Sequence, residues 1–123
     1  MTREELKSFI KNQYGVISEV LWPDEPGFEV FRHPCGKWFG VVMNIDGTKI
    51  GEKEGEIDVL NVKCDPMLLD ILVQKTGYKR GYHMNKRLWL TILLDLVDER
   101  DVKGLVCESY DLVTPKKDRK KAR

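Results

Sequence analysis

Residues 88–94 of this 123-residue chain read LWLTILL, and this run constrains the fold more than any other stretch. Nearly every position is apolar, on both sides of the two-residue period of a strand. One side carries Trp89 and Leu93, and the other carries Leu90, Ile92 and Leu94. A strand that is apolar on both sides needs cover on both faces, so we expect either an interior strand of a sheet or a strand covered by a partner.

Local signals predict the first two helices. Thr2 and Glu5 have the spacing of a capping box, which starts a helix that Gly15 then ends. Asp65 and Pro66 suit the N-cap and N1 positions of a second helix. The second helix carries a broad apolar face, so we expect it to be well buried.

The remaining elements follow from periodicity and turn residues. Strands are predicted at residues 28–32, 37–43, 57–63, briefly within 78–86, and at 88–94. An apolar stripe from Val102 to Val113 predicts a last helix, which Pro115 closes. The order α-β-β-β-α-β-β-α is typical of an α+β, two-layer domain with one antiparallel sheet covered by helices.

Composition divides the chain into a body and a tail. At 123 residues and 41% hydrophobic, the chain suits one domain, which we assign to residues 1–115, followed by a disordered basic tail at 116–123. The tail holds six of the 21 Lys+Arg and one of the 20 Asp+Glu, so it carries +5 and leaves the body at −4. An acidic body argues against a dedicated, high-affinity nucleic-acid binder, since such domains are usually basic overall.

The same survey limits chemistry and location. Three cysteines, Cys35, Cys64 and Cys107, form no CxxC pair, so we expect reduced thiols, no metal site and no cofactor. No constellation of side chains indicates catalysis, and we expect a non-enzymatic protein. The sequence shows neither a signal peptide nor a membrane-spanning run, so a cytoplasmic location without membrane binding is expected.

Four motifs, in order along the chain, resemble the MmcQ/YjbR-like family. They are HPCGKWF at residues 33–39, KCDP at 63–66, GYHMNKRLW at 81–89 and SYDLV at 109–113. The nine-residue match is the specific one. The resemblance implies a CyaY-like or secretion-chaperone-like α+β fold, and DNA binding through a double-wing arrangement of hairpins.

Functional residues are expected around the loop at 81–87, because residues 71–94 contain five cations and no acid. The candidates for binding nucleic acid are Lys37, Lys63, His83, Asn85, Lys86 and Arg87, whose side chains can contact phosphates or base edges. The candidates for lining a groove or stacking on a base are Trp38, Tyr82 and Trp89. The structural alternative is that Lys86 and Arg87 are only solvated, that His83 and Asn85 only hold the loop, and that Trp89 belongs to the core.

The hypothesis from sequence is a monomeric, non-enzymatic binding module for DNA or another polyanion. A small-molecule or protein-partner module with a groove lined by Trp38, Tyr82 and Trp89 is the rival from a different class. Salt separates the two, since polyanion binding weakens steeply as salt rises.

Overall fold

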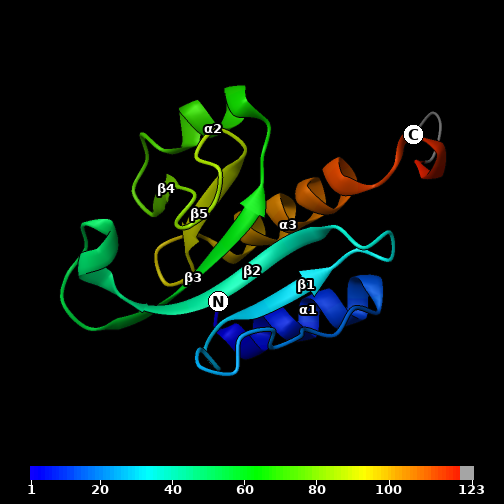
Figure 1. Cartoon of the computed structure of the whole chain (residues 1–123). Coiled ribbons are helices and arrows are strands. Elements are labelled where there is room, and N and C mark those ends of the chain that lie inside the picture. Colours follow the sequence, from blue (N-terminus) through cyan, green and yellow to red (C-terminus); the bar gives the residue numbers. More distant parts are fainter. Residues whose placement is uncertain (120–123) are drawn as a thin grey trace.

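The computed structural model describes residues 1–119, and within them a five-stranded antiparallel sheet carries three helices on one face (Figure 1). The helices are α1 (Arg3–Tyr14), α2 (Pro66–Leu72) and α3 (Glu99–Val113). The strands are β1 (Glu29–Arg32), β2 (Trp38–Asp46), β3 (Glu56–Lys63), β4 (Tyr78–Arg80) and β5 (Trp89–Leu93). Two short 3₁₀ helices, η1 (Gly47–Ile50) and η2 (Lys116–Asp118), complete the described elements. The predicted α+β class and element order are confirmed.

The strand order is β1-β2-β3-β5-β4, so β5 lies between β3 and the edge strand β4. Leu90 pairs with Val62 on one side and with Arg80 on the other. The prediction that the run LWLTILL supplies an interior strand is therefore confirmed. Its first residue, Leu88, lies outside the strand and is exposed.

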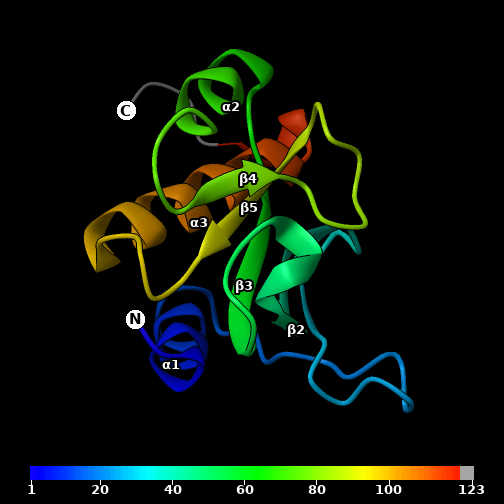
Figure 2. The same cartoon turned by 90° about the vertical axis from the view of Figure 1, so that its left-hand side faces the viewer.

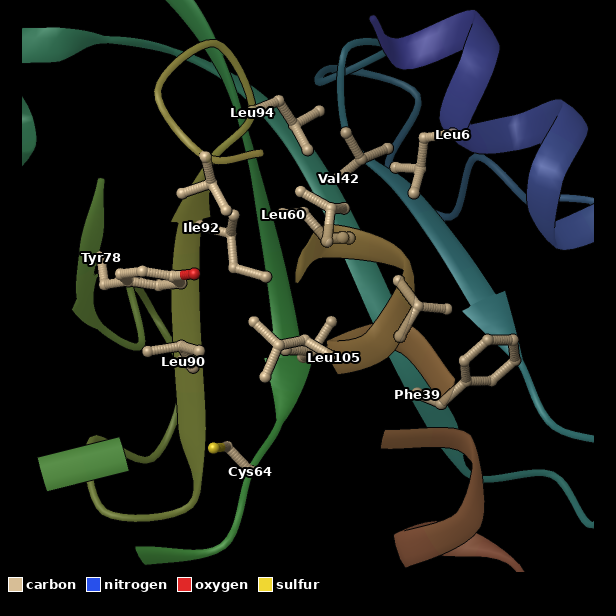
Figure 3. Close-up of a cluster of buried hydrophobic side chains, with 14 of the residues drawn as sticks. Leu6, Phe39, Val42, Leu60, Cys64, Tyr78, Leu90, Ile92, Leu94 and Leu105 are labelled. Atoms are coloured by element: carbon tan, nitrogen blue, oxygen red, sulfur yellow. The ribbon is translucent and has the colours of Figure 1, made fainter. Parts of the chain in front are cut away.

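The helices cover one face of the sheet, and the main core lies between the two layers. Leu6 and Ile10 of α1, Leu69 of α2 and Leu105 of α3 join Leu90 and other strand residues there. Figure 3 shows part of this cluster, with Leu6, Leu90 and Leu105 among its aliphatic side chains and Phe39 and Tyr78 at its edges. Burial of this apolar surface is the main force that holds the layers together.

The helix ends follow the local signals. The Thr2 hydroxyl accepts from the Glu5 N–H and the Glu5 carboxylate accepts from the Thr2 N–H, which completes the capping box, and Gly15 ends the helix with φ 70°. The Asp65 carboxylate accepts from two N–H groups at the start of α2. The predicted deep burial of α2 is wrong, because Met67 and Ile71 are 77% and 56% exposed. With only seven residues, α2 can press just one narrow stripe against the sheet.

Ser109 fixes α3 to the end of the sheet. Its hydroxyl donates to the Phe39 carbonyl oxygen at 2.6 Å and accepts from the Lys63 N–H at 2.8 Å. The side chain therefore bridges β2 and β3 where their direct pairing stops at Gly40 and Val62. This contact explains the SYDLV motif as a structural one.

The opposite face of the sheet has no helix over it among residues 1–119. A second buried cluster there contains Val30, Val41, Met43, Ile45, Val59 and Leu93. Half-buried side chains from loops, including Phe28, Tyr82 and Met84, pack against it. We call this the open face. Figure 2, turned by 90°, shows the loop between β4 and β5 reaching out from the sheet on the side away from α3.

The predicted basic tail begins with η2, and the Arg119 side chain donates to the carbonyl oxygens of Leu112 and Thr114. Residues 120–123 of the expected disordered tail lie outside the described part of the chain. No helix described in residues 1–119 has the length and apolar character needed to cross a bilayer.

Candidate functional site

The loop at residues 81–88 is fastened to the open face by a buried polar pair. Asn61 and Thr91 stand side by side on β3 and β5, both fully buried, and the Thr91 hydroxyl donates to the Asn61 amide oxygen. Asn61 donates to the Tyr82 carbonyl oxygen at 3.1 Å, and the Tyr82 N–H donates to the Thr91 hydroxyl at 2.8 Å. The polar groups inside the sheet face thus satisfy each other and fix where the loop begins.

Contacts within the loop set its shape. The Asn85 amide oxygen accepts from the Arg87 N–H at 2.9 Å, and the Lys86 ammonium donates to the Gly81 carbonyl oxygen at 2.8 Å. Gly81 is required for close packing, because a Cβ there would lie 2.8 Å from the Trp89 Cβ. His83 takes the left-handed conformation, with φ 59°. Asn85 therefore holds the loop as the structural alternative expects, whereas Lys86, which that alternative treats as only solvated, also contacts the backbone. Arg87 is exposed.

Residues 71–94 contain no acid, but carboxylates from other parts of the chain and from a neighbouring residue contact two of their cations. Lys79 pairs with Glu52 at 3.0 Å, and Arg80 pairs with Asp70 at 3.0 Å. Folding thus brings carboxylates from elsewhere in the chain against two cations of residues 71–94, neither of which is among the candidates from the sequence.

A smaller group of cations gathers where β2 begins and β3 and β5 meet. Lys37 directly precedes β2, Lys63 ends β3, and Arg87 precedes β5, and antiparallel pairing places these three termini at one end of the sheet. We call this the cationic strand end. The Lys63 ammonium lies 5.7 Å from the centroid of the Trp89 ring, a cation–π distance.

Trp89 is not a core residue, contrary to the preferred structural interpretation. It begins β5 on the open-face side, is only half-buried, and belongs to neither buried cluster. The pairing with Lys63 follows from the register, in which the two residues are direct cross-strand partners.

An apolar pocket of about 270 Å³ lies on the open face. It is lined by Trp22, Glu25, Phe28, Trp38, Val41, Met43, His83 and Met84. Two candidates from the sequence, Trp38 and His83, thus meet here, while Tyr82 and Trp89 are not among the lining residues. Tyr82 instead packs its ring 4.1 Å from that of His83.

Sequence reasoning missed the pocket wall that Trp22, Glu25 and Phe28 supply. The segment WPDEPG at residues 22–27 has the composition of a connecting loop, because its prolines and glycine disfavour regular structure. Trp22 and Phe28, at the two ends of this segment, were the available signal, but their meeting with Trp38 depends on the loop folding back over β2.

His33 has both ring nitrogens occupied. Nδ1 accepts from the Cys35 N–H at 2.9 Å. The Thr114 hydroxyl donates to the Tyr110 carbonyl oxygen, so Nε2, 3.0 Å from that hydroxyl, donates to it and the ring is the neutral Nε2–H tautomer. Burial lowers the pKa of His33, partly opposed by Asp118. The HP turn is thereby tied to the end of α3.

The cysteines and acids offer little chemistry. Burial, with Asp65 and Glu108 nearby, raises the pKa of the Cys64 thiol to about 11, so it is protonated at neutral pH. Within residues 1–119, no three His, Cys, Asp or Glu side chains are grouped closely enough to hold a metal ion together. Asp65 is used as the N-cap of α2.

Comparison with known proteins agrees with this architecture. The YjbR family model matches residues 11–112, which is most of the chain. The chain belongs to the YjbR family.

Two relatives in this family are named as uncharacterised proteins. YyaQ of Bacillus subtilis is 36% identical over 115 residues, covering 91% of this chain and 98% of YyaQ. YbdF of Escherichia coli O157:H7 is 31% identical over 111 residues, covering 85% of this chain and 82% of YbdF.

Solved structures show the same fold. A crystal structure of a Pseudomonas syringae protein superposes with a TM-score of 0.90 at 31% identity, covering 93% of this chain and all of that one. A crystal structure of a Deinococcus radiodurans protein gives a TM-score of 0.73 at 26% identity, covering 97% of this chain and 83% of that one. These two solved structures support the sheet and helix arrangement described above.

Proposed function

We propose that this protein is a non-enzymatic binding module for a polyanion, with DNA as the first ligand to test, and that the cationic strand end is its contact surface. The observation that carries the proposal is the convergence of Lys37, Lys63 and Arg87, which lie far apart in sequence, at one end of the sheet. Within residues 1–119, none of the three is in a salt bridge, unlike Lys79 and Arg80.

Local physical chemistry favours an anion there despite the acidic body. Screening confines electrostatic effects to about 8–10 Å at physiological salt, so a ligand responds to the nearby cations rather than to the net charge. Lys63 and Arg87 can each neutralise a phosphate and release its counterion. Trp89, under the Lys63 ammonium, offers a ring on which a base can stack.

Two cations at the start of the tail lie at the same end of the molecule. Cys35 donates its thiol hydrogen to the Val113 carbonyl oxygen at 3.6 Å, so the turn before Lys37 lies against the end of α3 (Figure 1). Lys116 and Lys117 follow directly in η2, and both are exposed. The double-wing description stays a prediction.

Fluorescence anisotropy with labelled duplex and single-stranded DNA over a series of salt concentrations tests the proposal. Affinity should fall as salt rises, with a logarithmic slope of about −0.9 per neutralised phosphate on duplex DNA. The double variant Lys63→Ala/Arg87→Ala should bind more weakly and reduce the magnitude of that slope by about 2.

The matched control is Lys49→Ala/Lys53→Ala, which removes the same charge from exposed positions beyond the other end of β2. It should leave the slope unchanged. Equal losses in both double variants would replace a defined surface with diffuse attraction, and the absence of binding to either DNA at low salt would remove the proposal. A loss caused only by deleting residues 116–123 would assign the activity to the tail.

A small-molecule binding module is the second candidate. The open-face pocket, with its aromatic and methionine lining, is the observation that favours it. Concave, mostly apolar pockets are the usual form of small-molecule sites.

A further inference from the structure

In the open-face pocket, the Trp22 ring stands nearly at right angles to two other aromatic rings. The Trp22 ring makes an angle of 89° with Trp38, with centroids 5.8 Å apart, and an angle of 81° with Phe28, with centroids 6.3 Å apart. Perpendicular rings of this kind form adjoining walls, whereas stacked rings would cover each other's faces. Trp22 is 38% exposed, so its ring is reachable from solvent.

The wall that carries Trp22 and Phe28 is held in place by backbone contacts. The Glu25 N–H donates to the Trp22 carbonyl oxygen at 2.9 Å, and the Phe28 N–H donates to the Glu25 carbonyl oxygen at 3.0 Å. The Asn44 N–H donates to the Gly27 carbonyl oxygen and joins these two successive turns to β2. Pro23 and Pro26 restrict the backbone further, so a ligand meets walls that are largely preformed.

The charge of the lining is unlike that of the cationic strand end. Glu25 supplies a carboxylate, and the eight lining residues include no lysine and no arginine. Aromatic rings present negative faces, which attract cations, and a carboxylate beside them adds to that attraction. A phosphate or carboxylate group would meet repulsion here.

The apolar remainder of the lining selects among cations. A primary ammonium group has three N–H donors and is strongly hydrated, so it needs several acceptors, and the lining is mostly carbon and sulfur. A quaternary ammonium group has no N–H to satisfy, and its methyl groups can contact the half-buried Phe28 and Met84 as apolar surface. The pocket's volume, slightly below the ~300 Å³ lower limit of drug-sized sites, suits a single head group.

We propose that the open-face pocket binds the quaternary ammonium group of a small compound of the choline class, with the cation against Trp22 and Trp38 and beside Glu25. Charge complementarity favours this ligand, because a cation suits the Glu25 carboxylate and the faces of the aromatic rings. The site is independent of polyanion binding, because it uses neither Lys63 nor Arg87.

Two-dimensional NMR titration without DNA tests the proposal. Choline should shift the indole N–H resonances of Trp22 and Trp38, and its uncharged isostere, with a tert-butyl group in place of the trimethylammonium group, should bind more weakly. Trp22→Leu, which keeps an apolar wall but removes the ring, should weaken choline binding roughly five- to thirtyfold. Trp22→Phe should restore part of the affinity.

Glu25→Gln provides a second, milder variant on an exposed loop. It should weaken choline binding by about two- to fivefold and leave the isostere unaffected. The matched control Glu54→Gln removes a carboxylate from another exposed turn and should change neither ligand's affinity.

Equal affinity for choline and the isostere would overturn the proposal, because it would show an apolar pocket without cation selectivity. So would choline shifts that persist unchanged in both Trp22→Leu and Glu25→Gln. A trimethyllysine peptide that binds where choline does not would replace the small compound with a protein ligand. DNA binding can fail or succeed in its own assay without affecting these results.

Discussion

The two faces of the sheet are built in different ways. The helix-covered face holds buried, mostly aliphatic side chains from all three helices and from the strands. The open face carries the polar pair Asn61 and Thr91 at its centre and is covered by loops with half-buried aromatic residues. Because loops supply little apolar burial, the open face contributes less to stability and has more freedom to present binding groups.

The pair Asn61 and Thr91 shows what this difference requires. An apolar pair at those positions would suit a second layer of helix, but it would leave the backbone of Tyr82 without partners. The amide and the hydroxyl instead hold the loop at 81–88 against the sheet. Polar residues inside a sheet face thus position the loop that carries Arg87 and the wall that carries His83 and Met84.

The largest expected contrast between the faces concerns phenylalanines. Phe39→Ala, at a fully buried site facing the helices, should lower the free energy of unfolding by about 3–5 kcal/mol. Phe28→Ala, half-buried on the open face, should cost less than half as much. Urea unfolding followed by circular dichroism measures both, and equal losses would contradict the division of labour between the faces.

Loss of the Thr91 hydroxyl should be the next largest effect. Thr91→Val leaves the Tyr82 N–H and the Asn61 amide oxygen without their partner and should cost about 1–3 kcal/mol of unfolding free energy. Amide hydrogen exchange at Tyr82 should rise with it. Thr48→Val, at an exposed hydroxyl in η1, should stay within about 0.5 kcal/mol, and an equal cost there would refute the role of the buried pair.

A pH dependence is expected from His33 at the edge of the helix-covered face. Its pKa is lowered in the fold from an unfolded value of about 6.5, so between the two values the unfolded chain binds the proton and the folded chain does not. Stability should therefore fall as pH drops below about 6.5, by at most about 1.4 kcal/mol per pH unit.

Unfolding at a series of pH values checks this dependence. His33→Gln should remove the fall in stability, and His83→Gln, on the open face, should retain it. The reverse result would assign the pH dependence to the open face and contradict the role of His33.

The smallest effect should come from the cation–π pair. A double-mutant cycle with Lys63→Met and Trp89→Leu should give a coupling free energy of about 0.5–1 kcal/mol, because the pair is only partly buried. Chemical unfolding of the four proteins supplies the numbers. A coupling of several kcal/mol would return Trp89 to the core.

Local signals predicted the elements well and their burial less well. The capping box at Thr2 and the Asp65-Pro66 start of α2 act within one turn of helix, so they can be recognised from neighbours in sequence. The exposure of Met67 and Ile71 depends on how much of a short helix reaches the sheet, which no local pattern encodes.

For the candidate site, too, the sequence predicted some residues and missed others. The sequence predicts function in the loop at 81–87, and it listed Trp38 and His83 among the candidates; the structure brings these two into one pocket. It gave no sign that Lys79 and Arg80 are paired with carboxylates, and it missed Trp22 and Glu25. Salt bridges to Glu52 and Asp70, and the return of the loop at 22–28 over β2, are long-range contacts.

The sequence alone determined that a strand apolar on both sides lies within residues 88–94 and that a cationic loop precedes it, because a period of two and the absence of acids are properties of consecutive residues. Only the tertiary structure decided which cations are paired with carboxylates of the protein itself, and which aromatic rings line a pocket together. Those outcomes depend on residues brought together across the sheet, where a carboxylate or a ring from a distant segment changes the chemistry of its new neighbour.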